Sequence, residues 1–332
     1  ERRLESLKRR FQRDLSLEHK YRTVMDDYLV KGYARRLPPN EALVSGQRKW
    51  YLPHFPVLNP NKPGKVRIVF DAAAEFENTS LNKNLLQGPD HTNSLVGVLM
   101  RFRQENVGLA ADIESMFDQI KVMPEDQDSL RFLWWPNDTK EEPEEYVMTI
   151  HIFGATDSPC AANSALKKTA EDNEASFDAE TTRTVKKNFY VDDLLKSLNT
   201  TERAVHQAHE LIKLCAKGGF NLTKFTSNDR EVLSSLSAEK RANPNLDLSL
   251  DKLPNERTLG VSWNLESDEL GFKVVEMKKP DTMRGVLSTI CTIFDPLNFV
   301  APVMLVAKKI MQELWRKKYS WDEQLEGDIL QR

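Results

Sequence analysis

Apolar residues recur at helical spacing near the start of the chain, and a basic face lies opposite them. This spacing predicts a helical segment over residues 1–36. The apolar stripe consists of Leu4, Leu7, Phe11 and Leu15. The pair Pro38-Pro39 predicts the end of the segment, because proline lacks the amide proton that a helix requires.

A run that begins at Lys65 alternates between polar and apolar residues, as a half-buried strand does. The positions that share the predicted buried face are Val66, Ile68 and Phe70. Lys65 and Arg67 therefore project from the opposite face of this strand.

The remaining pattern predicts a mixture of helices and strands. Predicted helices cover residues 93–104, 159–171 (with Ser158 as N-cap and Pro159 in the first turn), 201–217 and most of the chain after 281, with a break at Asp295-Pro296. Predicted strands cover residues 107–113, 131–135, 146–150, both sides of Asp192-Asp193 within 188–198, and a hairpin of 259–265 with 271–275. Because helices and strands do not alternate strictly, the predicted fold class is α+β.

Composition indicates a folded protein with an uneven charge distribution. Of 332 residues, 40% are hydrophobic and 29% are charged, which excludes a disordered or collagen-like chain. Residues 1–70 contain 16 Lys and Arg against 7 Asp and Glu, whereas the rest contains 31 against 43. A basic N-terminal arm is typical of nucleic-acid binding, although a solvated basic helix explains the charge equally well.

The longest apolar stretch gives no reason to expect a membrane anchor. It runs from Phe299 to Ala307 and contains Pro302, whereas a spanning helix needs about 20 residues. Three widely spaced cysteines favour a reducing compartment over a disulfide framework. The chain starts at Glu1 without a signal sequence, and we interpret it as part of a longer polypeptide.

Three aspartates are the strongest candidates for chemistry. Asp192 and Asp193 stand between two apolar strands, where paired acids are usually solvated turn formers. Asp112 ends the apolar stretch of residues 107–111, where a carboxylate needs a cation or hydrogen bonds to offset its desolvation. If the two strands are neighbours, three carboxylates converge on an all-oxygen site suited to Mg²⁺. Two such ions about 4 Å apart can clamp an in-line phosphoryl transfer.

These aspartates lie in motifs that resemble those of reverse transcriptases. The box Tyr190-Val191-Asp192-Asp193 resembles their Y-x-D-D motif, and Ala111–Phe117 resembles their first catalytic motif. Further strings resemble the polymerase of BEL/Pao-type LTR retrotransposons, in the family's order from about residue 45 to the C-terminus. These strings are residues 60–71, 80–83, 86–90, 130–136 and 294–297.

The resemblance implies an RNA-directed DNA polymerase with a right-hand fold, in which helices flank an antiparallel palm sheet. The implied domains are a basic helical segment (1–44), fingers (45–106 and 125–150), palm (107–124 and 151–280, with the Tyr-Val-Asp-Asp and primer-grip hairpins) and the start of a thumb (281–332). The implied cofactor is a pair of Mg²⁺ ions, with Mn²⁺ as an alternative. The implied partners are an RNA template, a DNA or RNA primer and dNTPs, with RNase H and integrase in the same polyprotein. The implied location is a cytoplasmic virus-like particle or the nucleus.

The resemblance also assigns roles to individual residues. The implied metal ligands are Asp112, Asp192, Asp193 and the backbone carbonyl of Ile113. The implied nucleotide-binding residues are Lys65, Arg67, Phe117, Phe153 and Lys224, of which Phe117 excludes a 2′-hydroxyl and Lys224 is a candidate proton donor. The implied primer grip is Gly260, Val261, Ser262 and Trp263. Asp157 departs from the retroviral pattern, in which a small residue precedes Ser-Pro.

Two other functions stay open at this point. A right-hand RNA-dependent RNA polymerase would use the same metal ions, but Phe117 argues against it because a ribose would clash with the ring. A decayed or domesticated copy would bind nucleic acid without catalysis. The intact Asp112 and Asp192-Asp193 argue against decay, whereas Asp157 favours it.

Overall fold

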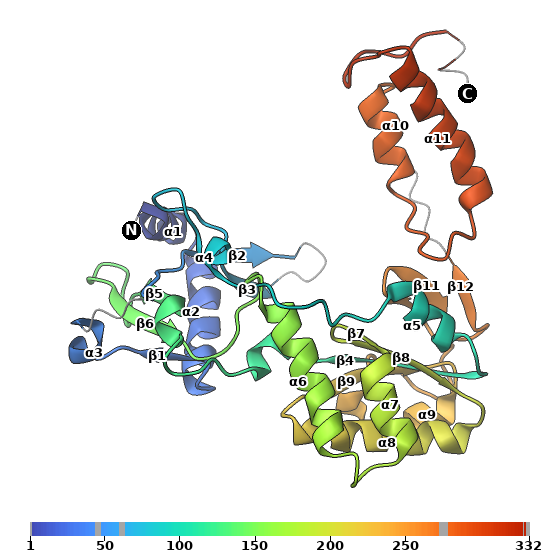
Figure 1. Ribbon diagram of the computed structural model, residues 1–332, viewed down its shortest axis with the longest axis horizontal. Coiled ribbons are helices and arrows are strands. Elements are labelled where there is room, and N and C mark those ends of the chain that lie inside the picture. Colours follow the sequence, from blue (N-terminus) through green and yellow to red (C-terminus); the bar gives the residue numbers. More distant parts are fainter. Residues whose placement is uncertain (1, 44–47, 60–63, 272–277, 328, 330–332) are drawn as a thin grey trace. The chain divides into compact units, whose positions relative to one another are not determined.

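The structure is a computed structural model that describes residues 2–43, 48–59, 64–271, 278–327 and 329. It has an α+β fold, and all the strand pairs in its described sheets are antiparallel (Figure 1). The α+β prediction is therefore confirmed. The chain divides into two compact units, which are residues 1–92, 114–176 and 214–221, and residues 93–113, 177–213 and 222–332.

The first unit contains two small sheets and several helices around one hydrophobic core. Its sheets are β1-β6-β5 (Ala34–Arg36, Glu144–Met148, Arg131–Trp134) and β2-β3 (His54–Leu58, Val66–Phe70). Its helices are α1 (Arg2–Arg13), α2 (Leu15–Val30), α3 (Pro39–Leu43), α4 (Leu81–Asn84), α6 (Ser158–Asp172) and the 3₁₀ turns η1 (Met116–Gln119) and η2 (Gln127–Leu130).

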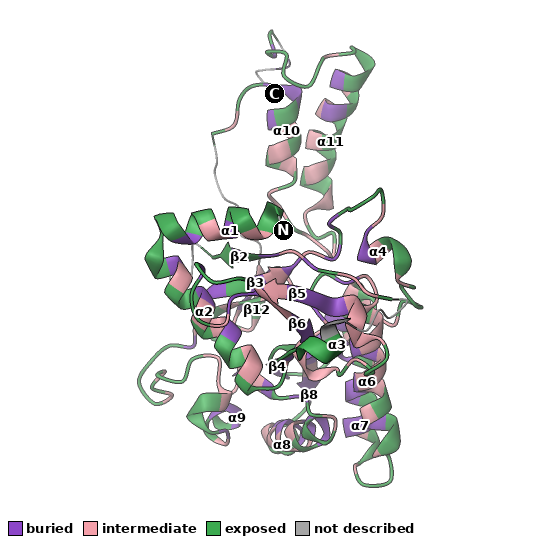
Figure 2. Cartoon of the chain, turned by 90° about the vertical axis from the view of Figure 1, so that its left-hand side faces the viewer, coloured by how far each residue is buried: buried purple, intermediate pink, exposed green. Residues whose placement is uncertain are grey.

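The predicted N-terminal helical segment is two helices followed by a strand. The break falls at Asp14, whose side chain caps α2 by accepting a hydrogen bond from the backbone N–H of Leu17 (2.9 Å). Leu7 and Phe11 are buried as predicted, but Leu15 is 72% exposed because it begins a new helix with a different face inward. In Figure 2, α1 is exposed along most of its surface.

Strand β3 has the predicted alternation. Val66, Ile68 and Phe70 are buried, and Arg67 is exposed. Lys65 is exposed and directly precedes the strand. The two cations therefore lie on the solvent side of the β2-β3 pair.

The second unit is built on a four-stranded sheet in the order β7-β8-β4-β9, and α7 and α8 run along one of its faces (Figure 1). Its strands are β4 (Val107–Ile113), β7 (Phe189–Tyr190), β8 (Asp193–Leu198) and β9 (Leu222–Ser227), with a second sheet of β10 (Asn255–Thr258), β11 (Val261–Asn264) and β12 (Glu269–Gly271). Its helices are α5 (Leu95–Phe102), α7 (Ala179–Lys187), α8 (Thr201–Lys217, whose last turn belongs to the first unit), α9 (Arg230–Ser234), η3 (Ala238–Lys240), α10 (Met283–Ile290) and α11 (Ala301–Arg316).

The C-terminal part of the chain is helical on both sides of the predicted break at Asp295. The Asp295 carboxylate accepts hydrogen bonds from the N–H groups of Phe299 (3.0 Å) and Val300 (2.8 Å), which fixes the approach to α11. Most of the predicted strand at 271–275 lies outside the described residues. Within the ranges that are described, no helix is both long and apolar enough to cross a membrane.

Candidate active site

Asp112 and Asp193 are direct neighbours across two strands of the second unit. Asp112 is the penultimate residue of β4, Asp193 is the first residue of β8, and their Cα atoms are register partners. Opposed residues of an antiparallel pair project from the same face, with Cβ atoms about 5 Å apart. The structure thus brings together two of the predicted ligands that are distant in sequence.

Asp192 lies in the tight turn that precedes β8. Tyr190 pairs with Asp193, so that Val191 and Asp192 form a two-residue hairpin loop. The Asp192 carbonyl accepts a hydrogen bond from the N–H of Ile113 (2.9 Å), which ties the loop to the end of β4. Val191 has a φ of +56°, a left-handed conformation that costs a β-branched residue about 1–3 kcal/mol. The loop is therefore held in a strained conformation beside the aspartates.

The negative charges in this region interact. Burial, followed by the charges of Asp192 and Asp112, raises the pKa of Asp193 to about 7, and Lys224 acts in the opposite direction. The charges of Asp192 and Asp112 therefore favour the protonated form of Asp193.

Lys224 supplies a positive charge to the site. Its ammonium group forms an ion pair with Asp112, whose side chain is 26% exposed. The register of β9 against β4 shifts between Ala110 and Asp112, and Lys224 has a left-handed φ of +54° at this irregularity. The bulge therefore aims the predicted proton donor at the predicted metal ligand.

The ligand set for a metal ion is only partly assembled. In the part of the chain that the structure describes, no three His, Cys, Asp or Glu side chains are arranged to hold a metal. The donor chemistry still fits Mg²⁺, because the clustered groups are carboxylates and their repulsion is what a hard cation would relieve. In this arrangement Lys224 pairs with Asp112.

The raised pKa of Asp193 predicts that acid stabilises the metal-free chain. Between about pH 4 and pH 7 the folded chain retains a proton that the unfolded chain releases, so the free energy of unfolding should fall as pH rises through this window. Urea denaturation in EDTA at about pH 5 and pH 7.5 measures this difference. Asp193→Asn should reduce it, and an equal pH dependence in both proteins would contradict the assignment.

In the first unit, Phe153 lies beside two other predicted nucleotide-binding residues, Phe117 and Arg67. The rings of Phe117 and Phe153 meet edge to face with centroids 5.9 Å apart, and the Arg67 guanidinium lies 5.9 Å from the Phe153 centroid. Phe153 is 57% exposed, and Phe117 is half-buried. The sequence analysis did not single out Asp118. Burial raises the pKa of this carboxyl group, and the Ser115 hydrogen bond and the charges of Lys31 and Arg67 offset only part of the increase. Its position next to Phe117 is the signal that could have found it.

Asp157 occupies the N-cap position of α6 that the sequence analysis gave to Ser158. The Ser158 hydroxyl instead donates a hydrogen bond to the carbonyl of Ile152 (2.9 Å). The Asp157 carboxylate lies 3.8 Å from His151 Nδ1, and its Oδ1 is buried without a hydrogen-bond partner among the described residues. The unusual carboxylate is therefore part of a local His-Asp pair.

The predicted primer grip forms the turn and second strand of a hairpin. Leu259 and Gly260 both have positive φ (46° and 84°), as a type I′ turn between β10 and β11 requires. The side chains of Val261 and Trp263 are 2% and 0% exposed, so they face the core. Of the four predicted grip residues, only Gly260 and Ser262 are accessible.

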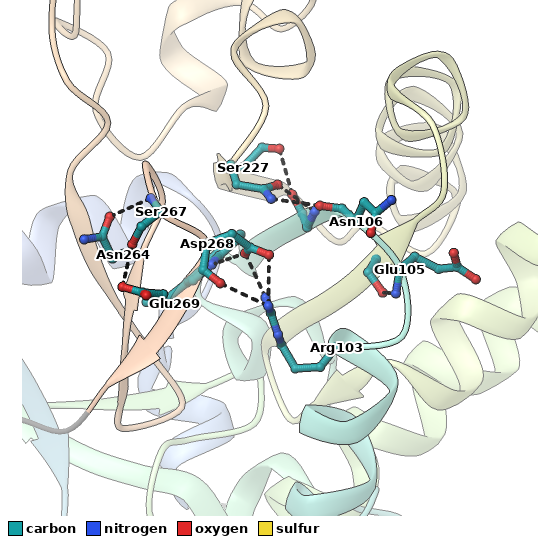
Figure 3. Close-up of polar contacts among 12 residues, drawn as sticks. Arg103, Glu105, Asn106, Ser227, Asn264, Ser267, Asp268 and Glu269 are labelled. Atoms are coloured by element: carbon teal, nitrogen blue, oxygen red, sulfur yellow. Dashed lines mark hydrogen bonds and ion pairs between the residues drawn. The ribbon is translucent and has the colours of Figure 1, made fainter.

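Polar contacts fix this hairpin to the helix before β4, as Figure 3 shows. Arg103 binds both carboxylate oxygens of Asp268 (2.8 and 2.9 Å), and the Trp263 indole N–H donates to the same carboxylate (2.8 Å). The Trp263 ring also packs edge to face on Phe102, with centroids 4.8 Å apart. The sequence analysis missed the Arg103–Asp268 pair.

Comparison with known proteins gives a family match to the C-terminal part of the chain. A family model described as "Pao retrotransposon-like RNaseH-like domain" matches residues 282–332, the segment predicted as the start of the thumb. The residues described there form α10, α11 and an isolated bridge between Thr282 and Gln324. No curated protein matches the chain.

Solved structures of the foamy viral protease-reverse transcriptase share the fold. One, named dRH and in complex with double-stranded DNA, has 15% identity and a TM-score of 0.59, over 94% of this chain and 46% of that chain. A second, also with double-stranded DNA, has 15% identity and a TM-score of 0.59, over 95% of this chain and 55% of that chain. A third, with an RNA/DNA hybrid, has 14% identity and a TM-score of 0.53, over 88% of this chain and 33% of that chain. The chain thus spans about half or less of the length of these proteins.

Proposed function

We propose that the chain is the RNA-directed DNA polymerase part of a BEL/Pao-like retroelement Pol protein. The observation that carries this proposal is the pairing of Asp112 with Asp193 across β4 and β8, with Asp192 in the adjoining turn. This pairing brings together acids of two polymerase-like motifs that are far apart in the sequence. The fold shared with foamy viral protease-reverse transcriptase supports the same conclusion.

In this proposal the sheet β7-β8-β4-β9 is the palm, the β2-β3 pair belongs to the fingers and α10 begins the thumb. The partners are an RNA template, a primer and dNTPs. Complexes of the structural relatives with DNA and with an RNA/DNA hybrid support nucleic acid as the partner.

The aspartates would hold two Mg²⁺ ions. When bound, these ions would lower the pKa of the primer 3′-hydroxyl and neutralise charge on the triphosphate. Arg67 and Lys65 would bind phosphate oxygens, for which a guanidinium fork and an ammonium are suited. Lys224 would donate a proton to the leaving pyrophosphate, and it lies against Asp112 in this structure.

Primer extension on an RNA template with Mg²⁺ tests the proposal. We expect the folded chain to add deoxynucleotides to the primer and to prefer them to ribonucleotides. Extension with ribonucleotides alone would favour the RNA polymerase alternative. A chain that shows a cooperative thermal transition but extends no primer would contradict the proposal.

A second candidate is a copy that binds nucleic acid without catalysis. The Lys224–Asp112 ion pair favours it, because the lysine occupies a carboxylate oxygen of Asp112 that a metal ion would need. Mg²⁺ binding distinguishes the two functions, since only the polymerase needs the aspartates to exchange Lys224 for the ion. Titration with Mg²⁺ that leaves Asp112 paired with Lys224 would support the non-catalytic copy.

Phe117 should determine the choice of sugar. If the ring lies against the sugar of the incoming nucleotide, a ribose 2′-oxygen would overlap it, and close-packed sites have little room to relax. Phe117→Val should raise the relative use of ribonucleotides, about tenfold for each 1.4 kcal/mol of clash removed. Primer extension with each nucleotide type measures the ratio.

Phe76→Val provides the control, because Phe76 is a phenylalanine of the first unit that is 67% exposed. This variant should keep the wild-type sugar preference. If Phe117→Val also keeps it and only loses stability, Phe117 serves packing against Phe153 and not sugar selection.

A further inference from the structure

A basic pocket lies in the second unit, apart from the aspartates. It has a volume of about 380 Å³ and is lined by residues of α5, α7, β8 and the start of α8. The cations that line it are Arg101, Arg183, Lys196 and Arg203. Lys196 follows Asp193 by three residues along β8, so its side chain leaves the sheet from the opposite face. The pocket is therefore separate from the candidate active site.

The pocket exists because β7 is shorter than β8. β7 ends after two residues, and only Asn188 extends the pairing: its carbonyl accepts from Leu195 N–H and its side chain donates to the Leu195 carbonyl (both 2.9 Å). After Leu195, the edge of β8 that faces away from β4 no longer pairs with β7. Side chains of α5, α7 and α8 lie beside it and line the pocket. Arg101 reaches round this edge to donate to the carbonyl of Lys187.

The positive charge in the pocket is only partly neutralised. Glu180 is the single acidic residue among the described lining residues, and it pairs with both Lys196 (3.1 Å) and Arg203. Arg183 is exposed and makes no hydrogen bond or ion pair with any other described residue. Arg101 Nε is buried and, within the described ranges, has no acceptor. A buried unpaired donor is unfavourable, and a bound acceptor would relieve this cost.

We propose that this pocket binds the phosphate group of a small anion such as inorganic phosphate, pyrophosphate or a nucleotide. Arginine presents a planar fork of donors that matches phosphate oxygens, and the pocket contains three arginines and a lysine. Its volume lies in the range of small-molecule sites. Arg183 lies in α7 one turn after Glu180, so both residues face the pocket from the same helix. This site is additional to the proposed polymerase site and does not depend on it.

Calorimetric titration of the full chain with pyrophosphate tests the proposal. EDTA is included so that no metal ion can recruit pyrophosphate to the aspartates. Arg183→Gln should weaken binding about tenfold or more, because it removes a charged hydrogen-bond donor that has no structural partner. Lys187→Gln is the matched control: it removes the same charge from the exposed end of the same helix but outside the pocket, and should weaken binding much less.

Glu180→Gln should strengthen pyrophosphate binding, whereas Arg183→Gln should weaken it. It removes the carboxylate that competes for Lys196 and Arg203, so pyrophosphate should bind several-fold more tightly. A role for Glu180 in packing alone would not predict tighter binding. Circular dichroism and thermal melting confirm that each variant is folded.

Three results would overturn the proposal. These are the absence of saturable binding to the wild-type chain, equal weakening by Arg183→Gln and Lys187→Gln, and competition by an oligonucleotide that lacks terminal phosphates. The last result would assign the pocket to a nucleic-acid backbone instead of a small anion. None of these results bears on primer extension, so the failure of this proposal and that of the polymerase are distinguishable.

Discussion

Asp192→Asn should abolish primer extension and leave the chain folded. Even residues that only orient metal ligands cost about 10- to 100-fold when removed, so the loss of a ligand should exceed about 100-fold. Stability should be unchanged or slightly higher, because the charge of Asp192 is one of the causes that raise the pKa of Asp193. Extension rate and thermal midpoint, measured on the same preparation, test both parts.

Asp26→Asn is the charge-matched control. Asp26 is an exposed residue of α2 in the first unit, and its replacement should change neither extension nor stability. A large loss of stability in Asp192→Asn would mean that Asp192 holds the hairpin together. An unchanged extension rate would remove the carboxylates from the mechanism.

The central strand of the candidate site could be predicted from the sequence with its bounds. β4 runs from Val107 to Ile113 as expected, because the apolar stretch that precedes Asp112 is short and bounded by polar residues. The proximity of Asp112 and Asp193 could also be predicted from the sequence, because Asp112 lies at the end of one apolar strand and Asp193 at the start of another. The turn differs from expectation in one respect: Asp193 is already in the strand, and Val191 shares the loop with Asp192.

The interactions of Lys224 could not be predicted in the same way. Its direction depends on a register shift between β4 and β9 and on a left-handed backbone, and neither leaves a pattern in hydrophobicity. The pair Arg103–Asp268 joins residues separated by 165 positions, so local sequence carries no signal for it. The cations around Arg183 are likewise gathered from separate helices and a strand.

The hairpin residues show how a resemblance can fix a location but not an orientation. The resemblance assigned residues 260–263 to a primer grip, and the hairpin exists at this place. However, Val261 and Trp263 are two apart in a strand and both apolar, which is itself the pattern of a buried face. Giving that periodicity more weight would have predicted their burial.

Trp263→Ala should therefore be strongly destabilising. The indole is fully buried, packs on Phe102 and donates to Asp268, so its removal loses apolar burial, an aromatic contact and a hydrogen bond together. Phe or Trp to Ala in a core costs about 3–5 kcal/mol, and we expect a loss in this range. The fit is tight, since a Cβ at Gly108 would lie 2.7 Å from the Trp263 ring. Urea denaturation measures the change.

Two further variants separate the contributions. Trp263→Phe should cost less, because it keeps most of the apolar contact with Phe102 and loses the hydrogen bond to Asp268. Trp315→Ala, at a tryptophan of α11 that is 57% exposed, should change stability by about 1 kcal/mol or less. If Trp263→Ala leaves stability intact but slows extension, the indole acts on the primer as the resemblance implies. A loss of stability in Trp263→Ala with little change in Trp315→Ala would establish that Trp263 supports the hairpin from the core, which leaves Gly260 and Ser262 as its accessible surface.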